Sequence, residues 1–245
     1  MTKLLITGSS GRMGKTLIEA TQLNDKTVLG GTHDQGEDLV KAFDQIDACI
    51  DFTVHHFTKE VIAAALENGT PLVIGTTGHT DEEKAYIIGA SKSLPIVFAP
   101  NYSIGVNTLF YLTRKATQIL GNDAFDIEVT EMHHKHKIDS PSGTARRLLD
   151  ILNEETQTSY EDDVAHGREG NIGPRPSKEI GMHTLRGGDV VGDHTVMFAA
   201  DGERVELTHK ASSRMTFASG AVRAAVWIQD KPNGLYDMQD VLGLK

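Results

Sequence analysis

The N-terminal segment constrains the fold more than any other part of the chain. A short apolar run, Lys3 to Thr7, is followed at once by GSSGRMG and then by apolar residues at helical spacing. This order predicts a strand, a tight turn and a helix. Gly8 permits the turn, Gly11 lets a ligand approach the backbone, and Gly14 allows the helix to pack closely on the strand.

The same segment is a variant of the fingerprint that binds dinucleotides. A second strand is predicted at Thr27 to Thr32, and it ends at His33 and Asp34. Asp34 lies about 20 residues after the last glycine, where such folds place the acid that binds the adenine ribose. We therefore interpret the segment as a cofactor site. A glycine turn without a ligand is the alternative.

Strands and helices alternate through the rest of this region. Continuous apolar runs predict strands at Ala48 to Phe52, Leu72 to Gly75 and Ile96 to Ala99. Helical patterns lie between them, at Lys59 to Glu67 and Asp81 to Ser91. The alternation predicts an α/β fold with a Rossmann-like, doubly wound parallel sheet that helices cover on both faces.

Ligands of such sheets bind at the carboxyl ends of the strands. The loops that begin at Gly8, Phe52, Gly75 and Ala99 should therefore share one crevice. GTTGH at Gly75 and APNYSIGVN at Ala99 are rich in small, hydroxyl and amide groups that suit this role. Each loop taken singly could also be an ordinary turn.

A different pattern begins near residue 106. A helix is predicted at Val106 to Leu120, and Phe125 to Glu131 alternates in the period of a half-exposed strand. The polar stretch from Thr156 to Ser177 is expected to be a mobile or ligand-covering loop. Further short, partly alternating strands are predicted at Glu179 to Arg186, His194 to Ala200 and Arg204 to Lys210.

These patterns predict three segments. Residues 1–105 form the dinucleotide-binding domain, and residues 106–214 form a second α+β domain with a mostly antiparallel sheet. A helix at Met215 to Ile228 opens the last segment, residues 215–245, which is expected to return to the first domain.

The densest chemistry lies in EMHHKHKIDSPSGTA at residue 131. Histidine exchanges protons near neutral pH, and a neighbouring lysine lowers the pKa of an imidazole. Ser142 precedes a predicted helix start at which the backbone N–H groups of Gly143 and Thr144 would be presented, a typical site for carboxylate or phosphate. The segment predicts an acid/base cluster beside an anion site, for a small anionic substrate.

Two other interpretations of the cluster stay open. Imidazoles are common zinc ligands, but adjacent histidines on a strand point to opposite faces and cationic lysines repel a metal, so we expect no metal. A solvated surface run without function is the second alternative.

Composition excludes several classes of partner. The chain has 245 residues and a formal net charge of −10, which would repel nucleic acid. It lacks an apolar run of about 18 residues that could span a bilayer, and its start reads as a strand rather than a signal peptide. We therefore expect a cytoplasmic protein without nucleic-acid or membrane partners.

The chain resembles, from end to end, the 4-hydroxy-tetrahydrodipicolinate reductase family, also called dihydrodipicolinate reductase. The motifs that carry the resemblance are GSSGRMG at residue 8, DFT at residue 51, GTTG at residue 75, APNYSIGVN at residue 99, EMHHKHKIDSPSGTA at residue 131 and RMTFASGAVRAAVW at residue 214. The resemblance implies an NAD(P)H-dependent oxidoreductase of lysine and diaminopimelate biosynthesis, which reduces a cyclic dicarboxylate with loss of water. It also implies a homotetramer that forms through the sheets of the second domain.

The resemblance further implies roles for single residues. His133 would be the general acid/base, Lys137 a proton donor and His134 a substrate ligand, and the backbone amides of Gly143 and Thr144 would hold a ring carboxylate. The cofactor would be lined by Gly8, Ser9, Ser10, Gly11, Arg12, Met13, Asp34, Gly75, Thr76, Thr77, Ala99, Pro100, Asn101 and Tyr102.

The choice between NADH and NADPH is less constrained. The family acid at the ribose is often followed by an arginine, whereas Asp34 is followed by Gln35. Asp34 favours the free hydroxyl of NADH, while Arg12 or Lys15 could pair with the phosphate of NADPH, so we expect use of both. Two rival functions remain, a redox-sensing dinucleotide-binding module and a dehydrogenase of acyclic amino acids or semialdehydes.

Overall fold

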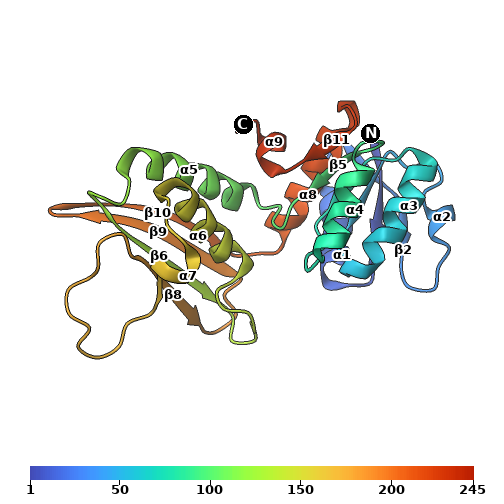
Figure 1. Ribbon diagram of the computed structural model, residues 1–245. Coiled ribbons are helices and arrows are strands. Elements are labelled where there is room, and N and C mark those ends of the chain that lie inside the picture. The colour runs from blue at the N-terminus through green and yellow to red at the C-terminus, as the bar shows by residue number, and fades with distance from the viewer. The chain divides into compact units, whose positions relative to one another are not determined.

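The computed structural model describes residues 1–245, which divide into two compact units. The terminal unit contains Met1–Ile104 and Arg214–Lys245, and the central unit contains Gly105–Ser213. The C-terminal segment thus belongs to the same unit as the N-terminus (Figure 1). No helix in the structure combines the length and the apolar character that a bilayer span requires.

The terminal unit is built on a six-stranded sheet in the order β11-β5-β4-β3-β1-β2, in which all paired strands are parallel. The side chains of the central strands are almost all fully buried, which explains their unbroken apolar runs. The strands are β1 (Thr2–Thr7), β2 (Thr27–His33), β3 (Ala48–Asp51), β4 (Leu72–Ile74), β5 (Pro95–Phe98) and β11 (Gly234–Tyr236).

Helices cover both faces of this sheet. Leu4 and Ile6 face a core that contains residues of α1 and α8, whereas Leu5 faces a second core that contains residues of α3 and α4. The predicted Rossmann-like, doubly wound fold is therefore confirmed. The helices are α1 (Arg12–Leu23), α2 (Leu39–Ala42), α3 (Thr58–Asn68), α4 (Asp81–Ala90), α8 (Met215–Trp227) and α9 (Met238–Leu242), with short 3-10 turns η1 (His55–Phe57) and η2 (Ile228–Asp230).

The central unit has a five-stranded sheet in the order β10-β9-β6-β8-β7. Strand β9 pairs antiparallel with β10 and β6, whereas β6, β8 and β7 are parallel. The sheet expected to be mostly antiparallel is thus mixed, because a long crossover returns the chain beside β6 in the same direction. The strands are β6 (Asp126–His133), β7 (Val164–His166), β8 (Ile180–Arg186), β9 (Gly192–Ala200) and β10 (Glu203–Ala211).

The buried core of the central unit joins one side of this sheet to two long helices, α5 (Ile104–Leu120) and α6 (Gly143–Thr156). Phe110 of α5 and Leu148 and Leu149 of α6 share this core with Ile127 and Val129 of β6. The side chains of β6 that alternate with these core residues form the opposite side of the sheet.

The polar segment expected to be a loop from Thr156 to Ser177 is more regular than its composition suggests. Ser159 caps the short helix α7 (Tyr160–Asp163), and β7 follows it at the edge of the sheet. Beyond β7, Arg168 and Arg175 bind Glu128. Because Glu128 alternates with the core residues of β6, these arginines attach the segment to the opposite side of the sheet.

Candidate active site

The row of buried side chains on β6 changes from apolar to polar along the strand. Ile127 and Val129 lie in the core, and the next two residues on the same face are Glu131 and His133, both buried. The register continues the change across the sheet, since Glu131 lies opposite His194 of β9 and Thr184 of β8. One end of the core therefore becomes a buried polar layer.

Glu131 is the centre of this layer and is fully buried. Its Oε1 accepts hydrogen bonds from the backbone N–H of Ser142 at 3.0 Å, from Arg186 at 3.2 Å and from Thr184 at 3.3 Å. Burial alone would raise the pKa of this carboxyl, but the imidazole of His194 at 3.6 Å and the hydrogen bonds from Ser142 and Arg186 outweigh burial and hold the pKa well below its usual range. Glu131 is therefore an ionised carboxylate.

His133 lies beside Glu131 with its Nδ1 3.4 Å from Oε2. Its ring packs edge-on against His194 at a centroid distance of 5.1 Å. At Gly192 of β9 a side chain would approach the Nε2 of His133 within 3.0 Å, so the glycine leaves room for the imidazole. Burial, and next the neighbouring His194, lower the pKa of His133 to about 4, so the ring is neutral near pH 7.

The other residues of the histidine cluster follow the end of β6. The backbone N–H of Lys137 donates to the carbonyl of His134 at 3.1 Å, which closes a turn. The Nζ of Lys137 forms an ion pair with Asp139 at 2.8 Å. His133 and Lys137 thus stand in one short segment, and the charge of Lys137 contributes to the lowered pKa of His133.

The N-terminus of α6 follows directly. The Oγ of Ser142 accepts a hydrogen bond from the backbone N–H of Ala145 and lies 3.2 Å from the Nε2 of His194. Gly143 begins the helix, and no neighbouring atom lies within 4 Å of where its side chain would be. The first turn of α6 therefore borders open space and carries the partial positive charge of a helix N-terminus.

In the terminal unit the glycine turn has the predicted tight geometry. Gly8 has a φ of +67°, and a side chain at Gly14 would come within 2.1 Å of the carbonyl oxygen of Gly8. Asp34, at the end of β2, accepts hydrogen bonds from Ser9 Oγ at 2.5 Å and from Ser10 Oγ at 2.9 Å. The hydroxyl of Ser9 makes the largest contribution to lowering the pKa of Asp34.

A pocket of about 760 Å³ opens beside this turn. It contains four of the predicted cofactor residues, Gly8, Ser10, Gly11 and Asp34. The loop that begins at Phe52 was also expected at this crevice, but no residue of it was named as a cofactor residue. The lining residues outside the named cofactor set are His33, Gln35, Gly36, Glu37, Leu39, Phe52, Thr53, Val54, His56, Phe57 and Glu60.

The pocket fits the adenosine part of a dinucleotide. The backbone at Gly8 and Gly11 is bare, the apolar side chains of Leu39 and Phe57 offer a surface for a base, and Asp34 stands at the end of β2. Strand order also reverses at β1, which has β2 on one side and β3 on the other, and such reversal points hold ligands in α/β sheets.

The remaining predicted cofactor residues do not line this pocket. Thr76 is buried and bonded to Asp51, and a side chain at Gly75 would collide with the ring of Phe52. Tyr102 belongs to the core, with its hydroxyl 2.9 Å from the carbonyls of Ile74 and Val97. Outside the pocket lie also Ser9, Arg12, Met13, Thr77, Ala99, Pro100 and Asn101.

Asp51 is a second buried carboxylate, which the sequence prediction missed as a site residue. It ends β3 and accepts hydrogen bonds from the hydroxyls of Thr53 at 2.6 Å, Thr7 at 2.7 Å, Thr76 at 2.9 Å and Thr58 at 3.3 Å. These threonines come from four places at the carboxyl edge of the sheet. The signal in the sequence is an acid within the otherwise apolar run ACID.

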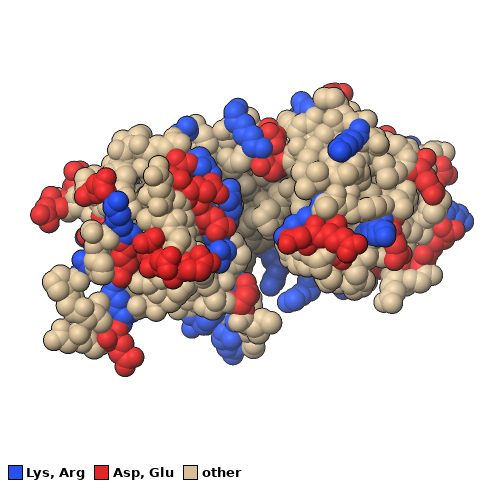
Figure 2. All heavy atoms as spheres, in the orientation of Figure 1, with Lys and Arg blue, Asp and Glu red and all other residues tan.

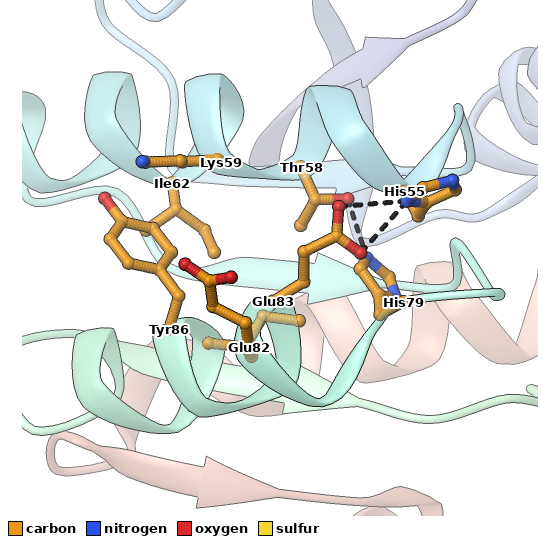
Figure 3. A pocket seen from close by; sticks show the side chains of 9 residues that line it. His55, Thr58, Lys59, Ile62, His79, Glu82, Glu83 and Tyr86 are labelled. Carbon is orange, nitrogen blue, oxygen red and sulfur yellow. Dashed lines mark hydrogen bonds and ion pairs between the residues drawn. The ribbon is translucent and has the colours of Figure 1, made fainter.

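A smaller cavity of about 280 Å³ lies between α3 and α4 (Figure 3). In its wall, His55 Nδ1 lies 2.9 Å from the carboxylate of Glu83, and His79 Nε2 lies 2.9 Å from Thr58 Oγ1. The hydroxyl of Thr58 in turn donates a hydrogen bond to the carboxylate of Asp51. The polar groups at this end of the cavity therefore pair with one another and support the Asp51 cluster.

The geometry could also accommodate a metal ion in the central unit. Glu131, His133 and His194 offer ligand atoms that all lie within 4.8 Å of one another. Arg186, however, already neutralises the same carboxylate at 3.2 Å, and a nearby cation opposes a second positive charge. We therefore treat the group as a hydrogen-bonded acid/base cluster.

Acidic and basic side chains are interspersed on the face of each unit that Figure 2 shows.

Comparison with known proteins agrees along the whole chain. Family models described as dihydrodipicolinate reductase, N-terminus and C-terminus, match residues 2–102 and 105–242. A 4-hydroxy-tetrahydrodipicolinate reductase of Akkermansia muciniphila is 64% identical over 244 residues, covering 100% of this chain and 99% of the relative. One of Chromohalobacter salexigens is 46% identical and covers both chains completely.

Solved structures agree on the fold. A dipicolinate-bound dihydrodipicolinate reductase from Paenisporosarcina sp. TG-14 superposes with a TM-score of 0.78 at 22% identity, covering 98% of each chain. GenD2 from gentamicin A biosynthesis, in complex with NAD, superposes with a TM-score of 0.61 at 10% identity, covering 99% of this chain and 90% of the other.

Fold and site together define an oxidoreductase of the nicotinamide-dinucleotide type, with a Rossmann-like unit and a separate unit that carries the acid/base cluster. Within that class, the chain belongs to the dihydrodipicolinate reductase family.

Proposed function

We propose that the protein reduces 4-hydroxy-tetrahydrodipicolinate to tetrahydrodipicolinate in lysine and diaminopimelate biosynthesis. One equivalent each of NAD(P)H and a proton is consumed, and one each of NAD(P)+ and water is released. The observation that carries this proposal is that His133 and Lys137 lie in the segment directly before the exposed first turn of α6, in a chain 64% identical to a reductase of that name.

The central unit would bind the dicarboxylate and supply the proton. The N–H groups of Gly143 and Thr144 at the start of α6 would hold one ring carboxylate, and His134 would bind the substrate beside them. Lys137 and His133 would deliver the proton to C3 of the ring. Since His133 is neutral near pH 7 without substrate, an approaching dianion would favour its protonated form.

The terminal unit would hold the cofactor. When bound, a reduced nicotinamide dinucleotide supplies the hydride that the substrate accepts at C4. The turn Gly8 to Met13 would approach the pyrophosphate, and Asp34 would bind the adenine ribose. The segments Gly75 to Thr77 and Ala99 to Tyr102 would line the remainder of the site.

We propose that both nucleotides are used, with NADH favoured. Asp34 is held toward the turn by Ser9 and Ser10, and Glu37 and Glu60 also line the pocket, so this wall is acidic. Acidic groups repel the 2′-phosphate of NADPH. Arg12 and Lys15 of the exposed first turn of α1 are the cations that would offset this repulsion.

The experiment is to follow nicotinamide absorbance with substrate made in situ by the synthase of the preceding step. Oxidation of NADH or NADPH that depends on this substrate is the expected result. No oxidation with either nucleotide would contradict the proposal. Nucleotide binding without turnover would favour a redox-sensing module, and turnover of acyclic amino acids or semialdehydes instead would favour a different dehydrogenase.

Assembly remains a prediction. A homotetramer formed through the sheets of the central unit would leave Glu128, Arg168 and His183, on the side of the sheet opposite Glu131, near the interface. Sedimentation velocity on the purified protein tests this prediction.

A further inference from the structure

The buried carboxylate of Glu131 has no role in the proposed reaction, although it adjoins His133. We propose that Glu131 is the positioning residue of the acid/base pair, which fixes the tautomer of His133 and couples that imidazole to the anion-binding turn of α6. The proposal rests on the proposed function.

The burial of the Glu131 carboxylate costs free energy, which a purely structural role does not explain. Two successive layers of the same core, at Ile127 and Val129, are apolar, with Phe198 and Val196 as their partners on β9. The third layer could have been apolar too, because a buried ion pair seldom stabilises a protein more than well-packed apolar side chains do. A fully buried carboxylate at this position therefore points to a function.

The two oxygens of Glu131 have separate partners. Oε1 binds the backbone N–H of Ser142, Arg186 and Thr184, which connects it to the cap of α6 and to β8. Oε2 has no hydrogen bond of good geometry and instead faces two imidazole nitrogens, His133 Nδ1 at 3.4 Å and His194 Nε2 at 3.6 Å. Catalytic contacts that are long without substrate commonly shorten when substrate binds.

The arrangement determines which nitrogen of His133 carries a proton. A carboxylate oxygen accepts hydrogen bonds and cannot donate them, so Nδ1 facing Oε2 is the protonated nitrogen of the neutral ring. Nε2, the other ring nitrogen, is then the one that exchanges a proton with a ligand. An orienting carboxylate of this kind serves the histidine of a serine-protease triad.

His194 completes the coupling. Its Nε2 lies between Glu131 Oε2 and Ser142 Oγ, while its ring packs edge-on against His133. A shift of α6 on binding an anion would thus reach His133 through Ser142 and Glu131. The charged and titratable groups that face His133 are Glu131 of β6, Lys137, Arg186 of β8 and His194 of β9.

The test substitutes Glu131→Gln. The amide preserves size and an acceptor for Ser142, but its NH2 group, facing His133, cannot accept from Nδ1–H. We expect the 15N NMR spectrum of the His133 imidazole to show a change from the Nδ1–H to the Nε2–H tautomer. We also expect kcat to fall by roughly 10²-fold, which is a smaller loss of kcat than removal of the orienting carboxylate causes in a serine-protease triad. The KM for nucleotide stays unchanged. Glu131→Asp restores a carboxylate and should recover the Nδ1–H tautomer.

Glu128→Gln is the matched control. Glu128 lies three positions earlier on β6, on the opposite side of the sheet, and is ionised within its own cluster of Arg168, Arg175 and His183. The Glu128→Gln variant should therefore have the kcat and the His133 tautomer of the wild type. Equal losses of kcat in both variants would overturn the proposal.

Two further results would also overturn it. One is an unchanged kcat and tautomer in Glu131→Gln. The other is stoichiometric zinc in the wild-type protein that is lost in Glu131→Gln, which would make the cluster a metal site. If the wild type proves not to be a reductase, the tautomer measurement still tests the contact, so the two failures are distinguishable.

Discussion

Each unit of the protein contains a fully buried carboxylate at the polar end of its sheet, and the two have different partners. Asp51 in the terminal unit is surrounded by hydroxyl groups of threonines, which are neutral. Glu131 in the central unit is surrounded by Arg186, His133 and His194, which carry or can accept positive charge.

This difference in partners separates a carboxylate that holds loops in place from a carboxylate that supports proton transfer. Threonine hydroxyls do not titrate near neutral pH, so the Asp51 cluster can only fix loops, among them the one that begins at Gly75. Imidazoles do titrate, and in this cluster burial, and next the neighbouring His194, lower the pKa of His133, whereas the charge of Glu131 acts to raise it. The comparison teaches that the same buried group supports a rigid ligand cradle or an acid/base site according to its donors.

The largest expected effect is on catalysis in the central unit. Lys137→Ala should lower kcat by about 10²–10⁴-fold, the contribution typical of a positioned acid or base, with nucleotide affinity unchanged. Steady-state kinetics with varied nucleotide and substrate measure both quantities. Lys135→Ala is the control, since this exposed neighbour carries the same charge. An equal loss in the control would mean that overall charge, and not Lys137, is required.

The next effect is on stability in the terminal unit. Asp51→Asn should lower the free energy of unfolding by about 2 kcal/mol, because buried hydroxyls lose an acceptor. Nucleotide affinity should fall as well, since Thr76 and Thr53 are no longer held together. Urea denaturation and nucleotide titration measure the two effects. Asp47→Asn, at an exposed carboxylate that accepts from the backbone of Lys3, should change neither.

The architecture was largely predictable because it depends on patterns that extend over many residues. Continuous apolar runs marked the buried parallel strands, and the alternation from Phe125 marked β6. The elements that were missed are short. β11 has three residues, Gly234–Tyr236, and β7 has three, Val164–His166, and such segments contain too few positions for a period to appear.

The site was harder to predict because its supporting residues meet across strands. Glu131 lies on the apolar phase of the alternation on β6, a signal that it is buried. Nothing local, however, indicates that His194 and Arg186 come to the same place, because strand register brings them there. Likewise Asp51 was visible as an acid in an apolar run, but its threonines are distant in sequence.

A third prediction concerns the dependence of stability on pH. The folded-state pKa of His133, about 4, lies below its ordinary value of 6.5, so between these values the unfolded chain binds more protons. The free energy of unfolding should therefore rise with pH between these two pKa values. In His133→Gln this rise should be smaller by on the order of 2 kcal/mol. Chemical denaturation at several pH values measures the slope. An identical slope in the variant would show that His133 does not contribute.

The smallest expected effect concerns the choice between NADH and NADPH. It tests whether a carboxylate that accepts hydrogen bonds from hydroxyl groups can also select a ligand. Asp34 resembles Asp51 in accepting from hydroxyls, those of Ser9 and Ser10, but it is partly exposed and borders the pocket. The Ser9 hydroxyl lowers the pKa of Asp34, so the carboxylate is ionised at neutral pH and opposes a 2′-phosphate. Asp34→Asn should therefore raise the ratio of kcat/KM for NADPH to that for NADH by roughly tenfold. Glu60→Gln removes another carboxylate from the same pocket and is the control. An equally large change of this ratio in Glu60→Gln would mean that the total charge of the pocket determines the nucleotide preference, and not the position in which Ser9 and Ser10 hold Asp34.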